Sequence, residues 1–126
     1  MFEQWRAQFS NLEIIALTGN HDILPHELYK GIQIRVLAEF REGPFLFRHH
    51  PSEIPEENFV FCGHVHPVFA LHAKARQTLR FPCFVVDDHQ MILPSFGVFT
   101  GGYGIEAMVS RRIYIVADQK VFNVRD

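Results

Sequence analysis

Three short segments of the sequence combine histidine with other side chains that bind metals or transfer protons. They are Gly19-Asn20-His21-Asp22, His49-His50-Pro51 and Gly63-His64-Val65-His66. Six of the first 66 residues are histidines, and five of these six fall in the three segments. Neutral imidazole nitrogen and amide oxygen are ligands for first-row divalent ions such as manganese, iron and zinc. The residue types therefore indicate metal chemistry.

Each segment directly follows an apolar run that is typical of a β-strand. The runs are Leu12–Leu17, Phe45–Arg48 and Phe59–Cys62. Adjacent strands of a sheet lie about 4.8 Å apart, so the loops at their ends can converge on one point. We expect the three histidine segments to meet at one edge of a sheet.

Taken singly, each motif has a simpler explanation. A pair such as His64 and His66 is commonly a half-exposed pair on a regular strand, where residues two apart leave the same face. Gly63 before the pair would let the backbone come close to an ion or substrate. An isolated Asn20-His21 pair would fit an ordinary turn formed by the asparagine side chain. The occurrence of three such segments in one short chain favours metal binding.

The remaining sequence predicts strands with a few short helices. Phe2, Trp5 and Phe9 have the spacing of one helical face, which predicts a helix over residues 1–11. A second short helix is expected over Leu24–Tyr29, and Gly101–Gly104 is expected to be a flexible connection. Further strands are predicted at Ile32–Ala38, Pro44–Arg48, Asn58–Cys62, Val68–Leu71, Thr78–Arg80, Cys83–Val86, Gln90–Leu93, Arg112–Val116 and Lys120–Val124. This pattern predicts a strand-dominated α/β fold.

Composition limits the class of protein. The 126 residues are enough for one domain with its own core, and 48% of them are apolar while 21% are charged, unlike disordered chains. The net charge of -2 gives no general attraction to nucleic acid, so any contact with phosphate must come from a local site. Cys62 and Cys83 lie in apolar runs and are expected to be buried and reduced. With no membrane span or secretory signal visible, a cytoplasmic location is expected.

The order of the histidine segments resembles a known family. Leu17–Asp22, the histidine after the Phe45–Arg48 strand, and Gly63–His66 look like the third, fourth and fifth motifs of the calcineurin-like metallophosphoesterases. The flanking sequence, including Phe45–Pro51 and the stretch Phe81–Tyr103, is similar to the bacterial ligase-associated DNA damage response endonucleases. The resemblance implies a metal-dependent hydrolase of phosphodiesters, with nucleic acid as a candidate substrate and manganese as the expected ion.

The resemblance also implies the metal ligands. Asn20, His49 and His64 would hold one ion, and His66 would reach the second ion of a binuclear pair. His49 is preferred over His50 because the histidine of the family usually comes first after the strand, with a proline two residues later. His50 remains an alternative ligand.

By the same resemblance, two further residues would act on the substrate. His21 would polarise the scissile phosphate or protonate its leaving oxygen, and Asp22 would orient and stabilise that imidazole. Arg48 is a candidate contact for substrate phosphate, although an exposed cation at a strand end is the commoner interpretation. The cluster Asp87-Asp88-His89 lies on the wrong side of the motif order and is predicted to be a hairpin turn.

The sequence also departs from the family pattern. The Asp-x-His and Gly-Asp motifs that open the family pattern are not present in these residues. The expected fold is therefore a partial metallophosphoesterase β-sandwich flanked by short helices, forming one incomplete domain over residues 1–126 without the N-terminal strands and metal motifs. Without the bridging aspartate, little holds two ions at about 3.5–4 Å from each other. An exposed sheet edge that favours self-association is a further expectation.

Three functional hypotheses follow. The first is a phosphoesterase that hydrolyses phosphodiester bonds, in nucleic acid among other candidates, by metal-activated water. The second is a catalytically inactive truncated fragment that binds at most one metal or a partner. The third is a mononuclear metal-binding module unrelated to hydrolysis. None of them involves a membrane.

Overall fold

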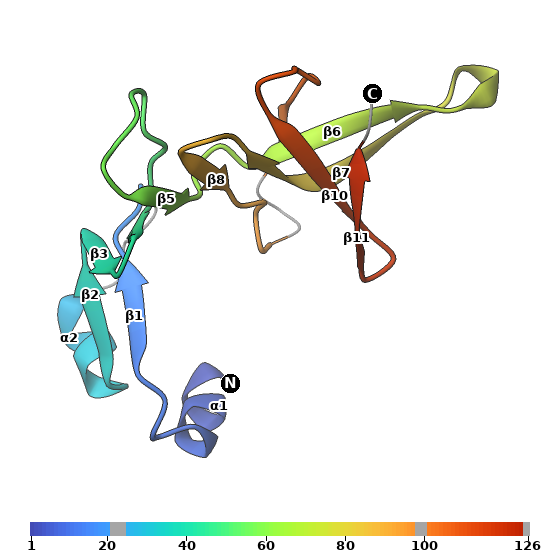
Figure 1. The fold of residues 1–126 in the computed structure, drawn as a ribbon. Helices are drawn as coiled ribbons and strands as arrows, with labels where there is room; N and C mark the ends of the chain where they lie inside the picture. Colours follow the sequence, from blue (N-terminus) through green and yellow to red (C-terminus); the bar gives the residue numbers. More distant parts are fainter. Residues whose placement is uncertain (21–24, 98–100, 125–126) are drawn as a thin grey trace.

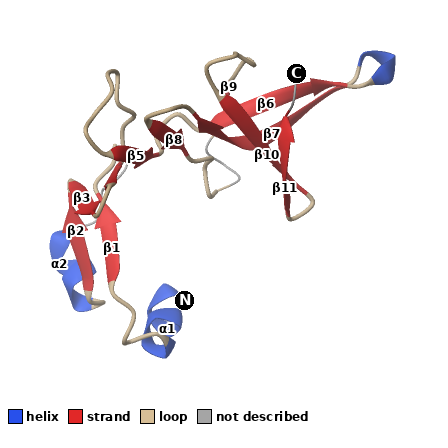
Figure 2. Cartoon of the chain, viewed as in Figure 1, coloured by secondary structure: helices blue, strands red, loops and turns tan. Residues whose placement is uncertain are grey.

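The chain is built mainly of β-strands (Figure 1; Figure 2). The computed structural model describes residues 1–20, 25–97 and 101–124. The helices in these ranges are α1 (Phe2–Gln8), α2 (His26–Gly31) and the single 3-10 turn η1 (Lys74–Arg76). The strands are β1 (Ile14–Leu17), β2 (Ile34–Leu37), β3 (Glu39–Glu42), β4 (Phe45–Arg48), β5 (Phe59–Cys62), β6 (Pro67–His72), β7 (Thr78–Val86), β8 (Gln90–Ile92), β9 (Tyr103–Gly104), β10 (Arg112–Ala117) and β11 (Lys120–Val124). The strand-dominated α/β fold predicted from the sequence is confirmed.

Most of the strands join one mixed sheet that curves across the molecule (Figure 1). Its main path runs in the order β11-β10-β7-β8-β5-β4-β3, with β6 paired to β7 and β9 paired to β6. β4 and β5 are parallel neighbours, and β5 is parallel to β8 on its other side. The carboxyl ends of β4, β5 and β8 therefore lie at the same edge of the sheet.

Two small groups of buried side chains stabilise this sheet. Leu46, Val60 and Cys62 on β4 and β5 form one group, and residues of β7 and β10, with Cys83 fully buried, form the other. Ile92 packs against both groups. Both cysteines are unpaired and buried, as the sequence predicted, and burial raises the pKa of each thiol to about 11.

The first helix and strand form a smaller unit. β1 pairs in parallel with β2, and no other strand of the described residues pairs with it. Arg6 of α1 is buried, and its guanidinium donates to the carbonyl oxygens of Ile32 and Gln33 at 2.9 and 3.1 Å, which ties α1 to the turn after α2. Self-association through an exposed sheet edge remains a prediction.

The structure corrects three expectations about the strands. Thr78–Val86 is one strand instead of two, because its first half pairs with β6 and its second half with β10. The polar β3 was not predicted and is formed by pairing with β4. Within Gly101–Gly104, expected to be a flexible connection, Tyr103–Gly104 is β9, and a Cβ on Gly102 would lie 2.6 Å from the side chain of Val68.

The helices are short. The predicted helix over residues 1–11 is seen as α1, and the helix predicted over Leu24–Tyr29 lies slightly later as α2. Among the residues that the structure describes, no helix is both long and apolar enough to cross a membrane.

Candidate metal centre

Three histidines gather at the edge of the sheet where β4 and β5 end. His49 and His50 follow β4, and His64 follows β5. Because the two strands are parallel neighbours, their following loops leave the same edge and lie side by side. One ring nitrogen from each histidine lies within 4.8 Å of the others. We call these three residues the histidine cluster.

The histidine rings are in direct contact with one another. Nδ1 of His64 lies 3.2 Å from Nε2 of His49. The ring centroids of His50 and His64 are 4.3 Å apart, and those of His49 and His50 are 4.9 Å apart. Of the alternatives left by the sequence, the structure therefore brings both His49 and His50 to the cluster.

The backbone after β5 is bent, which corrects the expectation for the His64-Val65-His66 segment. His64 and His66 have φ angles of 67° and 52°, and the Val65 N–H donates to the Gly63 carbonyl at 2.8 Å. This left-handed conformation costs non-glycine residues about 1–3 kcal/mol. The two histidines are not on a regular strand with a common face, and among the described residues His66 is not part of the histidine cluster.

The loop after β1 lies against the histidine cluster. Asn20 lines the same depression as His49 and His50. Its role as a metal ligand remains a prediction. A Cβ added to Gly19 would lie 2.8 Å from the His49 ring, so only glycine allows this approach without displacing the imidazole. At Gly63 the nearest atom to an added Cβ is the His49 carbonyl oxygen, at 4.0 Å. Gly19, therefore, is the glycine that the packing of the site requires.

Two residues assigned catalytic roles from the resemblance cannot be placed. His21 and Asp22 lie outside the described residues. Their roles remain predictions.

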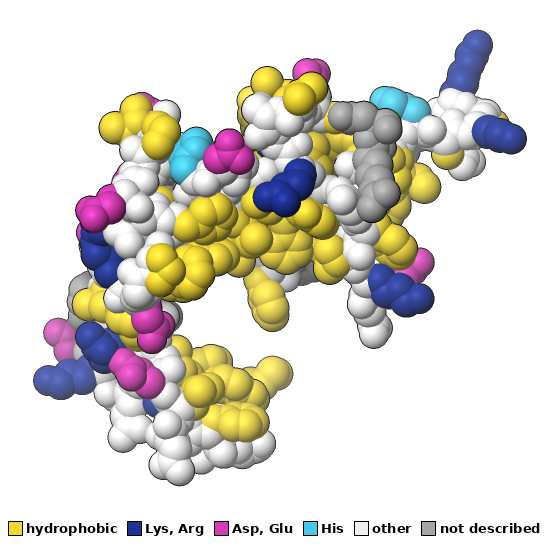
Figure 3. Space-filling model, in the orientation of Figure 1, with side chains coloured by type: hydrophobic (Ala, Val, Ile, Leu, Met, Phe, Trp, Pro, Cys, Tyr) yellow, Lys and Arg dark blue, Asp and Glu magenta, His cyan; other side chains and the backbone are white. Residues whose placement is uncertain are grey.

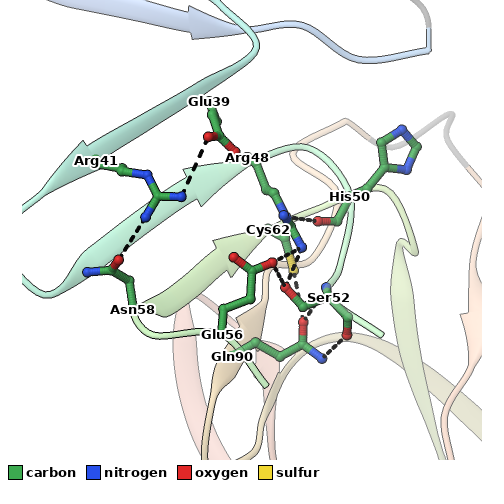
Figure 4. Close-up of polar contacts among 9 residues, drawn as sticks. All are labelled: Glu39, Arg41, Arg48, His50, Ser52, Glu56, Asn58, Cys62 and Gln90. Carbon is green, nitrogen blue, oxygen red and sulfur yellow. Dashed lines mark hydrogen bonds and ion pairs between the residues drawn. The ribbon is translucent and has the colours of Figure 1, made fainter. Parts of the chain in front are cut away.

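Arg48 holds the loop that carries His49 and His50 (Figure 4). Its guanidinium donates to the His50 carbonyl oxygen at 3.0 Å and to the Ser52 hydroxyl, and it forms a 2.7 Å ion pair with Glu56. The Arg48 side chain is only 24% exposed, so the interpretation as an exposed cation is wrong. Contact with substrate phosphate remains a prediction for a guanidinium whose charge is already balanced by Glu56.

Gln90 holds the same loop through hydrogen bonds to Ser52. This buried side chain, on β8, accepts the Ser52 N–H at 2.9 Å and donates to the Ser52 carbonyl at 3.2 Å. The His49 carbonyl in turn accepts the Gly63 N–H at 2.9 Å. Backbone groups of His49, His50 and Ser52 are thus all held by neighbouring strands or side chains. Sequence reasoning missed Gln90, because no local pattern links it to a loop 38 residues earlier.

The carboxylate in this network is kept ionised. The hydrogen bond from the Ser52 hydroxyl, at 2.8 Å, and the positive charge of Arg48 lower the pKa of Glu56 from its ordinary value. Glu56 therefore stays paired with Arg48 through the neutral pH range.

The Asp87-Asp88-His89 cluster forms the predicted hairpin turn between β7 and β8. The carboxylate of Asp87 accepts the N–H groups of His89 and Gln90 at 2.9 and 2.8 Å. This turn sets the start of β8 and with it the position of Gln90.

A solved structure has the same fold as this chain. No family model matches the sequence, and no curated protein matches it. The crystal structure of the Pseudomonas putida nuclease MPE is 36% identical, with a TM-score of 0.79. This chain resembles a nuclease. The match covers 97% of this chain and 59% of the nuclease chain, so the similar fold is shown for a part of that protein.

Proposed function

We propose that this chain carries the metal site of a metal-dependent nuclease and hydrolyses phosphodiester bonds in nucleic acid. The observation that carries the proposal is the histidine cluster, with its nitrogens within 4.8 Å of one another at the ends of two parallel strands. The likeness to a solved nuclease supports the choice of nucleic acid as substrate. The proposed ion is manganese or a similar divalent metal.

The cluster fits a metal ion by distance and by chemistry. Two nitrogens that each lie about 2.1 Å from one ion are roughly 3.0 Å apart in an octahedral arrangement and roughly 3.4 Å apart in a tetrahedral one. The observed separation of 3.2 Å between His49 and His64 lies between these two values. The same distance also allows a hydrogen bond between the rings when one nitrogen carries the proton and the other does not, so metal binding would replace that proton.

Several residues of the chain would hold metal ions. His49, His64 and the side chain of Asn20 would hold the ion, with His50 as the alternative ligand, and His66 would serve a second ion. A divalent ion bound there would act as a Lewis acid and lower the pKa of a coordinated water towards neutrality. Arg48, beside His49 and His50, is the candidate contact for the substrate phosphate.

Proton transfer to the leaving group is proposed for the loop after Asn20. His21 would donate a proton to the leaving oxygen of the phosphodiester, and Asp22 would hold its imidazole in the correct orientation. Both assignments rest on the family resemblance.

A non-catalytic metal-binding protein is the second candidate. The metal-binding group found among the described residues contains histidines and no carboxylate. An anionic bridging ligand holds the paired ions of a binuclear hydrolase. A chain that binds one ion without hydrolysing phosphodiesters would fit this second function.

One pair of measurements separates the candidates. Manganese binding is measured by titration calorimetry, and hydrolysis is measured with a chromogenic phosphodiester and with single-stranded DNA. We expect His49→Ala and His64→Ala to abolish both, while Asn123→Ala, at an exposed position of β11, retains both. Manganese binding without hydrolysis would select the second candidate. A chain that neither binds manganese nor hydrolyses either substrate would refute both.

A further inference from the structure

The β6–β7 hairpin projects from the main sheet as an arm (Figure 1). Its strands pair from Val68↔Pro82 to His72↔Thr78, and the turn η1 closes the tip. Every residue from 71 to 80 is exposed. The tip therefore has no packing role within the described part of the chain.

The arm concentrates positive charge in a chain that is negative overall. No acidic residue occurs between Glu57 and Asp87, whereas Lys74, Arg76 and Arg80 all lie on the arm. The net charge of the whole chain is -2. Figure 3 shows Lys and Arg side chains extending from the tip, separated from the acidic side chains on the rest of the visible face.

The two cations at the tip are not engaged elsewhere. Other arginines of this chain form ion pairs, and these pairs are Arg35–Glu13, Arg41–Glu39 and Arg48–Glu56. In the ranges that the structure describes, the side chains of Lys74 and Arg76 form no ion pair or hydrogen bond. Their charges are fully available to a ligand.

The turn at the tip has an unfavourable backbone. Ala75 and Arg76 both have left-handed φ angles, of 68° and 60°, which non-glycine residues seldom adopt. A cross-strand pair of exposed leucines, Leu71 and Leu79, lies just below this turn. The arm thus presents two cations beyond a small apolar surface.

We propose that the β6–β7 hairpin is a docking arm for the phosphodiester backbone of nucleic acid, bound through Lys74 and Arg76. The choice of nucleic acid rests on the proposed nuclease function. Lysine and arginine bind phosphates by releasing condensed counterions, which makes such binding steeply dependent on salt. The exposed leucines give sugars or bases an apolar surface beside those phosphates.

The chain connects the arm directly to the histidine cluster. β6 begins at Pro67, immediately after the His64–His66 segment. With a rise of about 3.4 Å per residue, the ten residues from His64 to Lys74 span at most about 34 Å. At about 3.4 Å per phosphate along one strand of B-DNA, this upper limit corresponds to roughly ten nucleotides. The arm would therefore bind phosphates within about ten nucleotides of the scissile bond.

The test compares two double variants with the same change in charge. Lys74→Gln/Arg76→Gln removes both cations of the tip, and Lys30→Gln/Lys120→Gln removes two exposed cations from α2 and β11. Binding of a fluorescein-labelled single-stranded 16-mer is measured by anisotropy over a range of salt concentrations, in EDTA. Circular dichroism and the two single variants at the tip check that the chain remains folded.

The expected loss follows from the number of phosphate contacts. Each contact contributes about 0.7 to the salt slope for a single strand, so the tip variant should lower the slope by about 1.4. If the two proteins bind equally at 1 M salt, a slope change of about 1.4 makes the tip variant bind about 25-fold more weakly at 0.1 M salt. The control variant is expected to stay within about threefold of the parent.

Equal affinities and equal salt slopes for the tip and control variants would refute the proposal that the hairpin is a docking arm. Because EDTA removes divalent metal, binding is measured independently of hydrolysis. A chain that binds the 16-mer through the tip but never hydrolyses it would refute the proposed nuclease and leave the docking arm supported.

Discussion

Replacing Gln90 with methionine is expected to loosen the loop that carries His49 and His50. Methionine has nearly the volume of glutamine and no amide group, so Gln90→Met preserves packing and removes the hydrogen bonds of the side chain. Two of these bonds join Gln90 to the N–H and the carbonyl of Ser52, at 2.9 and 3.2 Å, and a weaker third comes from the Cys62 thiol at 3.9 Å. The variant therefore isolates the contribution of the amide group.

The loss of stability follows from the two backbone groups of Ser52 that the variant leaves without partners. Ser52 and Gln90 are 6% and 7% exposed, so water has little access to the two backbone groups of Ser52. Each buried polar group left without a partner costs about 1–3 kcal/mol, and the apolar methionine offsets part of the sum. We expect the free energy of unfolding to fall by about 2–4 kcal/mol. At about 4 °C per kcal/mol for a domain of this size, the melting temperature should fall by about 8–16 °C.

The same variant should weaken metal binding. Side chains that orient metal ligands from outside typically change affinity by about 10–100-fold when they are removed. Since Gln90 acts on His50 through Ser52, we expect the lower end of that range, about tenfold weaker manganese binding. Thermal denaturation and calorimetric titration measure the two effects on the same sample, below the melting temperature of the variant.

The control is Gln77→Met, which makes the same substitution at an exposed position near the tip of the β6–β7 hairpin. This variant is expected to keep the parent's stability to within about 0.5 kcal/mol. The reasoning is refuted if the two variants agree in melting temperature and in manganese affinity. Lower stability with unchanged affinity would show that Gln90 supports the fold but does not position the histidines.

Two further predictions concern the same site. Gly19→Ala should weaken manganese binding by about tenfold, because its Cβ would lie 2.8 Å from the His49 ring. Gly31→Ala, with no atom within 4 Å of the added Cβ, should leave the affinity unchanged. Equal affinities of the two variants in calorimetric titration would contradict this prediction. The pKa of Glu56 lies below its ordinary value of 4.5, so its contribution to stability is complete above about pH 4.5 and is lost as the pH falls through the lowered pKa. Denaturation of the parent and of Glu56→Gln between pH 3 and pH 7 should show a shallower acid dependence for the variant, and parallel curves would exclude this role.

The sequence alone determined much of the framework. Alternating and continuous apolar runs predicted most of the strands, including β4 and β5, because burial of one or both faces of a sheet leaves that pattern in the chain. The polar residues that follow those runs predicted where His49 and His64 would lie, since parallel neighbouring strands end at the same edge. Burial of both cysteines followed from their apolar neighbours.

Only the tertiary structure decided how the site is held. Strand order places β8 next to β5, which brings Gln90 to Ser52 across 38 residues. The backbone bends after β5, and among the described residues His66 lies outside the histidine cluster. The need for glycine at Gly19 likewise comes from a ring that lies 30 residues later in the chain. A local pattern reports the backbone conformation and burial of its own segment. Contacts between distant segments depend on strand order and register, which no single segment encodes.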